Sequence, residues 1–144
     1  MGGGGLVRRF NWTLCPCVVA KEIEFWKVIM SIILQRKIAW CVGGDFNWVM
    51  QMDERRGYAS SSRGIPKFCE FVCTAALSNV PLQGKAFTWF GSENKCSRLD
   101  RFLVSNEWFQ RFDSLAVISL PRELFDHSPI LLVSDACDSG SKLL

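Results

Sequence analysis

The sequence predicts an α/β domain, because segments of helical periodicity alternate with short apolar runs of the kind that form strands. Two segments, residues 21–35 and 65–77, repeat apolar residues at helical spacing and predict helices packed on a sheet. Runs rich in strand-forming residues follow each helix and are separated by turn-forming residues. The chain of 144 residues is 49% hydrophobic and 22% charged, which is typical of a globular domain.

Residues 1–20 form a lead-in without clear periodicity, in which only residues 17–19 offer a short strand. The first helix is predicted at residues 21–35, and two basic residues follow it, where the helix dipole favours cations. Residues 38–42 then predict a buried strand. The inward face of the predicted helix consists of Ile23, Trp26, Met30 and Ile33.

A Gly-Gly-Asp-Phe-Asn stretch at residues 43–47 ends this predicted strand and is the best candidate for part of a functional site. The glycines let the backbone turn and leave room for a ligand, while Asp45 and Asn47 supply a carboxylate and a carboxamide. An Asx-type turn that only closes the strand accounts for the same residues equally well, because both side chains bond readily to their own backbone.

A polar stretch rich in serine, arginine and glycine, residues 51–64, predicts a long surface loop. It contains Arg55, Arg56 and Arg63. Guanidinium groups match the geometry of phosphate oxygens, so such a loop beside a carboxylate site could hold a phosphate backbone. A solvated loop with ordinary charges is the alternative interpretation.

The second helix is predicted at residues 65–77, with a proline in its first turn. Residues 87–90 and 98–104 predict a β-hairpin, because the segment between them includes the turn-forming run Gly-Ser-Glu-Asn. Ser105 could cap a short helix, and residues 115–120 predict a further strand.

Asp100 is unusual within its predicted strand, because it is a carboxylate with apolar neighbours. A buried carboxylate needs a partner. Asp100 therefore either pairs with Arg98 or Arg101, or faces a functional group.

The only histidine of the chain, His127, follows Asp126 and precedes an apolar run. A lone histidine is more often structural than catalytic. However, polar residues at three separate strand ends match the needs of phosphodiester hydrolysis, which are a metal held by carboxylates, an activated water and donors to the phosphate.

Charge and cysteine content narrow the function classes. The net charge of +3 is compatible with a phosphate-bearing partner but is far below that of a dedicated nucleic-acid binder. Seven cysteines without a C-x-x-C pair argue against the usual disulfide frameworks and zinc sites, and predict reduced thiols in an intracellular protein. No apolar segment approaches the length of about 18 residues that a membrane span needs.

Three motifs, in this order, resemble the second half of the endonuclease/exonuclease/phosphatase superfamily: Gly-Asp-Phe-Asn at 44–47, Ser-Arg-Leu-Asp-Arg-Phe at 97–102 and Asp-His-Ser-Pro at 126–129. Pro-Leu-Gln-Gly at 81–84 with Phe-Thr-Trp at 87–89 is similar, more narrowly, to the apurinic-type endonuclease domain of plant LINE-like, non-LTR retrotransposons. The resemblance extends from about residue 22 to residue 133.

The resemblance implies a four-layer α/β sandwich, in which two mixed β-sheets face each other between helices and the site lies at one edge. It implies that Asp45 lies close to the attacking water and that Asn47 positions the water and the phosphate. Asp100 is expected to orient His127, which contacts the scissile phosphate and takes part in general acid/base chemistry. Asp126 and Asp45 are expected to bind Mg²⁺ or Mn²⁺.

Departures from the family pattern imply an incomplete sandwich. The opening strand of the family and the strand with its metal-binding glutamate have no counterpart in this chain, Val19 stands where the family has a phosphate-contacting tyrosine, and Phe125 stands where it usually has serine. We therefore expect a partial domain over residues 21–134, followed by a flexible tail at residues 135–144.

Two hypotheses from different classes follow. The first is a Mg²⁺-dependent phosphodiester hydrolase of DNA-endonuclease type, with weak activity or none, in which Arg55, Arg56, Arg63 and Arg98 contact phosphate. The second is a non-catalytic remnant of a mobile-element domain with residual DNA binding. The retroelement resemblance implies a nuclear protein, and we expect neither a membrane nor an obligate protein partner.

Overall fold

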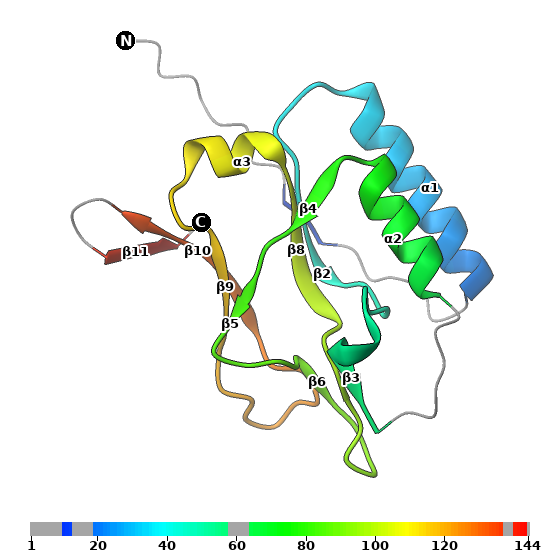
Figure 1. Cartoon of the computed structure of the whole chain (residues 1–144), viewed down its shortest axis with the longest axis vertical. Helices are drawn as coiled ribbons and strands as arrows, with labels where there is room; N and C mark the ends of the chain where they lie inside the picture. The colour runs from blue at the N-terminus through cyan, green and yellow to red at the C-terminus, as the bar shows by residue number, and fades with distance from the viewer. Residues whose placement is uncertain (1–9, 13–18, 58–63, 137–139, 144) are drawn as a thin grey trace.

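The computed structural model describes residues 10–12, 19–57, 64–136 and 140–143 (Figure 1). The helices of this part are α1 (Val19–Gln35), α2 (Ile65–Thr74) and α3 (Asn106–Arg111), with a short 3-10 helix, η1 (Met52–Glu54). The strands are β1 (Phe10–Trp12), β2 (Cys41–Asp45), β3 (Arg55–Arg56), β4 (Leu77–Asn79), β5 (Leu82–Gln83), β6 (Trp89–Phe90), β7 (Cys96–Ser97), β8 (Asp100–Ser105), β9 (Ala116–Ser119), β10 (Ile130–Ala136) and β11 (Gly140–Leu143).

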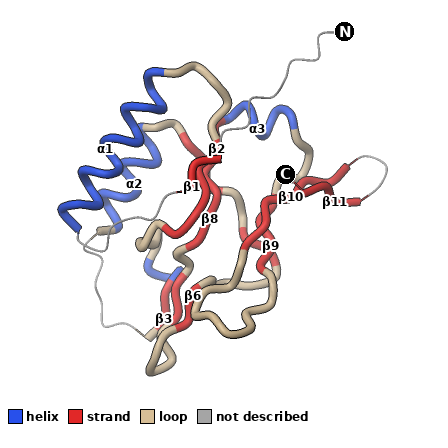
Figure 2. The backbone as a smooth tube through the Cα atoms, turned by 180° about the vertical axis from the view of Figure 1, so that it is seen from behind, coloured by secondary structure: helices blue, strands red, loops and turns tan. Residues whose placement is uncertain are grey.

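The described strands form two four-stranded sheets, β1-β2-β8-β4 and β11-β10-β9-β5, and a smaller sheet, β3-β7-β6. Both larger sheets are mixed, because β1 runs parallel to β2 and β5 runs parallel to β9, whereas the other neighbours are antiparallel. Helices α1 and α2 lie side by side on one face of the first sheet, as both ribbon views show (Figure 2).

Strand β8 connects the two hydrophobic cores, because its side chains alternate between the faces of the sheet. Leu103 packs in the core beneath α1 and α2, while Phe102 and Val104 pack in the core shared with the second sheet. Val117 of β9 and Leu132 of β10 complete that second core. The predicted α/β sandwich of two facing mixed sheets is therefore confirmed.

The first predicted helix is confirmed, and α1 begins two residues earlier than expected. Trp26 and Ile33 on its predicted inward face are 3% and 7% exposed. The Trp26 ring lies 5.2 Å from that of Phe68 and 6.0 Å from that of Phe71 on α2, measured between centroids. Aromatic packing thus joins the two helices above the sheet.

Strand β2 lies three residues later than predicted, over Cys41–Asp45 instead of residues 38–42. The two glycines belong to the strand itself and do not form a turn after it. A Cβ atom on Gly43 would lie 2.5 Å from the ring of Phe102 in the neighbouring strand β8. Gly43 is therefore required for the close approach of β2 to an aromatic side chain.

The second predicted helix is shorter than residues 65–77, since α2 ends at Thr74 and Leu77 begins β4. Ala76 adopts φ of +54°, in the left-handed region that often terminates helices. Leu77 is buried and continues the apolar pattern of the helix in the sequence. The sequence therefore gives no sign that the helix has ended and a strand has begun at this residue.

The predicted hairpin was wrong in its second strand. Strand β6 pairs with β7 at Cys96–Ser97, whereas β8 leaves this small sheet and inserts between β2 and β4. The chain crosses from one sheet to the other at residues 98–99. Strand β7 has only two residues, which is too short to show a strand pattern of its own in the sequence.

The segments expected to be irregular contain more structure than predicted. The loop at residues 51–64 includes η1 and β3, while residues 58–63 lie outside the described residues. The expected flexible tail contains the end of β10 and, in β11, a strand antiparallel to it. The lead-in contains β1, and of its predicted strand at residues 17–19 the structure describes only Val19, which begins α1.

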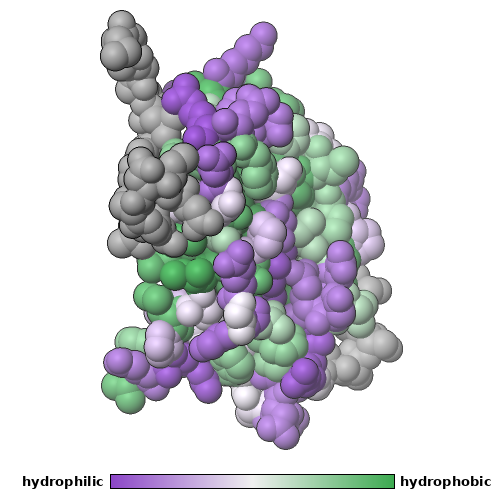
Figure 3. All heavy atoms as spheres, turned by 60° about the vertical axis from the view of Figure 1, so that its left-hand side comes forward, coloured by the Kyte–Doolittle hydropathy of each residue, from purple (hydrophilic) through white to green (hydrophobic). Residues whose placement is uncertain are grey.

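Some large apolar side chains remain at the surface of the described chain. Leu124 and Phe125 are 93% and 73% exposed. The face drawn in Figure 3 likewise shows hydrophobic patches among hydrophilic ones. None of the described helices combines the length and the apolar character that crossing a membrane demands.

Candidate active site

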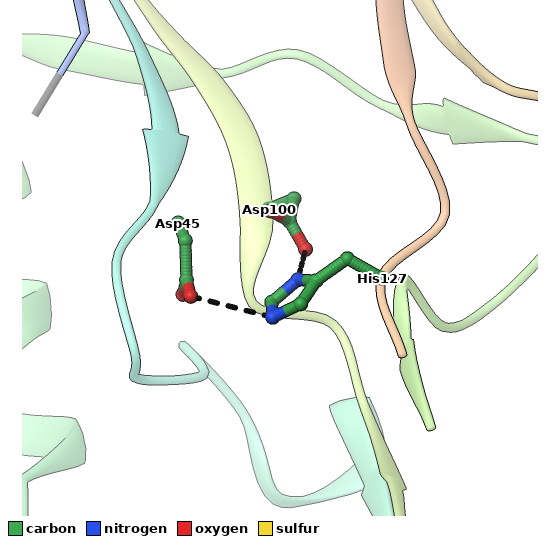
Figure 4. A group of neighbouring side chains, drawn as sticks. All are labelled: Asp45, Asp100 and His127. Atoms are coloured by element: carbon green, nitrogen blue, oxygen red, sulfur yellow. Dashed lines mark hydrogen bonds and ion pairs between the residues drawn. The ribbon is translucent and has the colours of Figure 1, made fainter. Parts of the chain in front are cut away.

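Three polar side chains from distant parts of the sequence meet at one end of the central strands (Figure 4). Asp45 is the last residue of β2, and Asp100, the first residue of β8, lies directly opposite it in the antiparallel pair. His127 comes from the segment before β10 and forms a single β-bridge with Trp89 of β6. The edge between the sheets thus collects two carboxylates and the only imidazole of the chain.

The imidazole of His127 lies between the two carboxylates. Its Nδ1 is 2.8 Å from Oδ2 of Asp100, and its Nε2 is 3.6 Å from Oδ2 of Asp45. The side chains of His127, Asp45 and Asp100 are 32%, 22% and 15% exposed. The group is therefore partly shielded from water yet open on the side where a substrate could approach.

The geometry also decides how Asp100 is paired. The sequence left open a pair with Arg98 or Arg101, or an orientation toward a functional group. The carboxylate of Asp100 faces His127, whereas both arginines form ion pairs with Glu54. Asp100 therefore belongs to the polar cluster.

Asp45 makes the Asx-type turn that the sequence offered as an alternative, and it takes part in the cluster as well. Its Oδ1 accepts a hydrogen bond of 2.8 Å from the backbone N–H of Asn47, while Oδ2 faces His127. Asn47 adopts φ of +59°, a left-handed conformation that asparagine tolerates well. The turn fixes the carboxylate and keeps one of its oxygens available.

Asp126 lies at the margin of the cluster and is exposed. Its Oδ2 accepts a hydrogen bond of 3.3 Å from the indole N–H of Trp89, and its carbonyl accepts one of 2.9 Å from the N–H of Phe90. The charge of Asp126 nevertheless acts on the cluster, where it raises the pKa of both Asp45 and His127.

Burial and charge shift two pKa values in the cluster. The pKa of His127 is raised above 6.5, chiefly because Asp100 accepts the imidazole hydrogen bond, although burial opposes this shift. The pKa of Asp45 is raised above 3.8, chiefly by burial and then by the charge of Asp100, while the N–H of Asn47 opposes the rise. Both shifts favour the protonated form of the group, so His127 holds its proton more tightly than a free imidazole does.

The raised pKa of His127 predicts that the free protein loses stability as the pH rises through neutrality. The folded chain holds this proton more tightly than the unfolded chain, so the stabilisation is complete below pH 6.5 and disappears as the pH passes the raised pKa. The pKa of Asp45 is also raised, so its contribution to stability likewise falls as the pH rises, starting near pH 3.8. Urea unfolding in the presence of a chelator, between about pH 5.5 and 8, measures the effect.

An Asp100→Asn variant is the control for this pH dependence, because a carboxamide carries no charge to hold the imidazolium. The free energy of unfolding of this variant should vary less between the two ends of the range. A parent chain whose stability rises from pH 6.5 upward would contradict the assignment of the proton to His127.

Several solved structures match this chain, and two of them match most of it. The catalytic domain of APE2 from Xenopus laevis matches with a TM-score of 0.61 at 15% sequence identity, over 94% of this chain and 51% of that domain. The chain has the endonuclease/exonuclease/phosphatase fold. A beta toxin (275-280) from Staphylococcus aureus matches with a TM-score of 0.57 at 17% identity, over 81% of this chain and 45% of the toxin.

The chain spans about half the length of each of these two structures. Comparison of the sequence with protein-family models finds no match, and neither does comparison with curated proteins. The likeness is therefore one of fold, and the chemistry of the site has to be argued from its own residues.

The acidic cluster could hold a metal ion. Asp45, Asp100 and His127 each offer one ligand atom, and these atoms lie within 4.8 Å of one another. Carboxylate oxygens suit Mg²⁺ and Mn²⁺, and an imidazole nitrogen is better suited to transition metals than to Mg²⁺. The donor set thus fits a divalent cation without selecting one.

The structure separates the arginines that were predicted to contact phosphate. The Arg55 guanidinium lies 5.7 Å from the centre of the Trp48 ring, and that of exposed Arg56 lies 5.1 Å from the centre of the Phe87 ring. Arg63 lies outside the described residues. Both described loop arginines therefore stack on aromatic rings of the same chain.

Arg98, for which a phosphate contact was predicted, lies mostly inside the protein. Its Nη2 donates a hydrogen bond of 2.9 Å to the carbonyl of Val80, its Nη1 lies 3.6 Å from Oε2 of Glu54, and its side chain is 12% exposed. A guanidinium that is engaged in this way has little surface left for a phosphate. The ion pair with Glu54 and the hydrogen bond to Val80 hold the guanidinium of Arg98 in this position.

Sequence reasoning missed two sets of buried polar contacts near the cluster, the pairs of Glu54 with arginines and the hydrogen bonds of Thr88. Arg101 is fully buried, with Nη2 3.1 Å from Oε2 of Glu54, and Thr88 is also fully buried. An arginine that alternates with leucines in a strand is a signal of such a buried ion pair, because the charge has to find a partner. No comparable signal identifies Glu54 or Thr88 in the sequence.

Proposed function

We propose that the chain is part of a metal-dependent phosphodiester hydrolase of the DNA-endonuclease type, derived from a LINE-like retrotransposon. The observation that carries the proposal is the position of the His127 imidazole, 2.8 Å from Asp100 on one side and 3.6 Å from Asp45 on the other. An Asp–His pair beside a second acid is an arrangement suited to general acid/base chemistry on a phosphate.

In the proposed reaction, water attacks the phosphorus atom and the bond to the leaving oxygen breaks. Asp45 accepts the proton of the attacking water, and the backbone N–H of Asn47 holds the carboxylate in place. Because Asp100 accepts the Nδ1–H of His127, the Nε2–H is directed at the phosphate and its departing oxygen. The proton from Nε2 then neutralises the leaving group.

We propose that Asp126 and Asp45 would hold Mg²⁺ or Mn²⁺, with Asp100 nearby. The described group with ligand atoms within 4.8 Å of one another is Asp45, Asp100 and His127, so Asp126 would have to turn toward this group from Trp89. When bound, the cation would offset the negative charge that develops on the phosphate. The raised pKa of Asp45 supports such a role, because a cation would favour the carboxylate form that the free site disfavours.

DNA is the proposed partner, and the arginines of β3 are its proposed contacts. Arg55 and Arg56 present guanidinium groups already ordered by aromatic rings, which reduces the conformational entropy that a phosphate contact would cost. We extend the proposal to a reducing, nuclear location, which the free thiols of Cys41, Cys69, Cys73 and Cys96 support.

Nicking of supercoiled plasmid tests this function. The purified chain should convert supercoiled to relaxed DNA in the presence of Mg²⁺ or Mn²⁺, and a chelator should stop the reaction. Preparing a His127→Ala variant in parallel distinguishes nicking by this chain from a contaminating nuclease. RNA, nucleotide and phosphoinositide substrates, tested in the same buffer, show whether DNA is preferred.

The second candidate function is a non-catalytic remnant that only binds DNA. The specific observation in its favour is that the described group able to hold a metal ion has only two carboxylates beside the imidazole that the proposed reaction needs as an acid. Phosphodiester hydrolysis has a very high uncatalysed barrier, so a partly assembled site would lose most of its rate. Salt-sensitive retardation of DNA in a gel, without metal-dependent nicking, would favour this alternative.

A further inference from the structure

Thr88 contacts both of the chain segments that carry the Asp100–His127 pair. Its side chain is fully buried. The hydroxyl oxygen Oγ1 accepts hydrogen bonds of 3.0 Å from the N–H groups of both Leu99 and Asp100. Its carbonyl oxygen accepts a hydrogen bond of 2.7 Å from the N–H of Ser128, the residue after His127.

The hydroxyl is needed where the chain crosses from one sheet to another. Residues 98–99 leave the pairing of β7 and enter that of β8, so the N–H groups of Leu99 and Asp100 require acceptors outside the regular ladders. Buried N–H groups without an acceptor are rare because they cost free energy. One hydroxyl of a neighbouring segment accepts from both.

The same segment also holds the backbone around His127. Trp89 lies opposite His127 in an isolated bridge, and the N–H of Phe90 donates a hydrogen bond of 2.9 Å to the carbonyl of Asp126. With the bond from Ser128 to Thr88, these contacts fix the histidine backbone on both sides. Residues 88–90 therefore lie between the two halves of the pair.

We infer that Thr88 is a positioning residue that sets the distance between Asp100 and His127. It forms a hydrogen bond with neither the imidazole nor the carboxylate, and its hydrogen bonds reach the backbone of both segments. The inference rests on the proposed function only in assuming that Asp100 and His127 take part in the chemistry of the site. Its first test therefore observes the contact itself and not hydrolysis.

The test compares two substitutions of Thr88. Thr88→Val keeps the shape of the side chain but removes the acceptor, whereas Thr88→Ser keeps the acceptor and removes a methyl group. Thr74→Val makes the same chemical change at an exposed threonine of α2 and is the matched control. Each variant is first shown to be folded by its thermal unfolding transition.

The readout is the NMR signal of the His127 Nδ1 proton in metal-free, untagged protein, which the single histidine of the chain makes unambiguous. We expect the far-downfield signal to persist in Thr88→Ser and Thr74→Val and to be lost or strongly shifted in Thr88→Val. If the parent nicks plasmid, Thr88→Val should be slower by about tenfold, as for other residues that orient a functional group indirectly. Thr88→Ser should restore most of the rate.

Two results would overturn the positioning role. A folded Thr88→Val variant that keeps the parent signal would show that the hydroxyl does not set the contact. A folded Thr88→Ser variant that loses the signal would assign the effect to packing of the methyl group. Retention of the expected NMR pattern without nicking by the parent would refute the proposed function and leave the positioning role intact.

Hydrogen exchange in the parent chain keeps the inference testable if Thr88→Val does not fold. The amide protons of Leu99 and Asp100 should exchange slowly, like those of the β8 ladder, because a buried acceptor holds them. Exchange at the rate of an exposed loop would contradict the role of the hydroxyl.

Discussion

Replacing His127 with alanine should lower the rate of metal-dependent plasmid nicking by about 10³-fold, the effect expected when a general acid/base is removed. The reason is geometric, because the described chain offers no other side chain that could carry a proton between Asp100 and Asp45 as His127 does at 2.8 and 3.6 Å. Rates are measured under single-turnover conditions with the parent and variant purified in parallel. A variant that nicks as fast as the parent would refute the proposed mechanism.

An Asp100→Asn variant provides the matched control for this prediction. A carboxamide in place of the carboxylate no longer accepts the Nδ1–H of His127 as a charged partner, so the imidazole loses its orientation and the favoured imidazolium form. Groups that act as a unit are not additive. The double variant should therefore be no slower than His127→Ala alone, and a further loss in the double variant would mean that Asp100 has a separate role.

Replacing Glu54 with glutamine should destabilise the chain by about 3 kcal/mol, as is typical when one partner of a buried ion pair is removed. The Glu54 carboxylate accepts N–H bonds from Met50 and Gln51 and forms ion pairs with Arg98 and Arg101. Arg101 is fully buried, so its charge would remain without compensation in the variant. Urea unfolding at neutral pH measures the difference in the free energy of unfolding.

The control for this prediction is Glu70→Gln on α2. Glu70 pairs with Lys67 at 3.4 Å, but the two side chains are 65% and 56% exposed. Exposed pairs contribute less than about 1 kcal/mol, so this variant should unfold at nearly the same urea concentration as the parent. If the free energy of unfolding fell by the same small amount in both variants, the buried pair would not be a major source of stability.

The sequence predicted the elements whose patterns are local. Apolar residues at helical spacing identified α1 and the first part of α2, because burial against a sheet selects that spacing. The end of α2 was missed because Leu77 of β4 continues the apolar pattern of the helix, and β7 was missed because a strand of two residues shows no pattern of its own. Strand β11 was missed because its residues, Gly-Ser-Lys-Leu, show no strand pattern. It is a strand through its pairing with β10.

The candidate site was predicted in part. Three motifs far apart in the sequence pointed to Asp45, Asp100 and His127, and the fold brings these residues together. Their roles in catalysis remain predictions. The ion pair of Arg98 with Glu54 was not predicted, because a sequence does not show which acid an arginine will meet, and Glu54 lies in a segment that was expected to be a loop.

The supporting residues could not be predicted for a physical reason. Thr88 matters through backbone groups of two other segments, and backbone N–H groups are the same in every sequence. Only the crossing of the chain between sheets makes those groups need an acceptor. Such requirements arise from tertiary structure and have no local pattern.

Asp45 and Asp100 lie directly opposite each other across β2 and β8. Like charges in facing positions of a sheet repel each other, so a neutral pair at this place would make the empty protein more stable. The facing carboxylates therefore lower the stability of the folded chain, and other contacts have to offset this repulsion. The aromatic packing of α1 and α2 is one of them. Such trade-offs between stability and activity are common where a site has been selected for what it does.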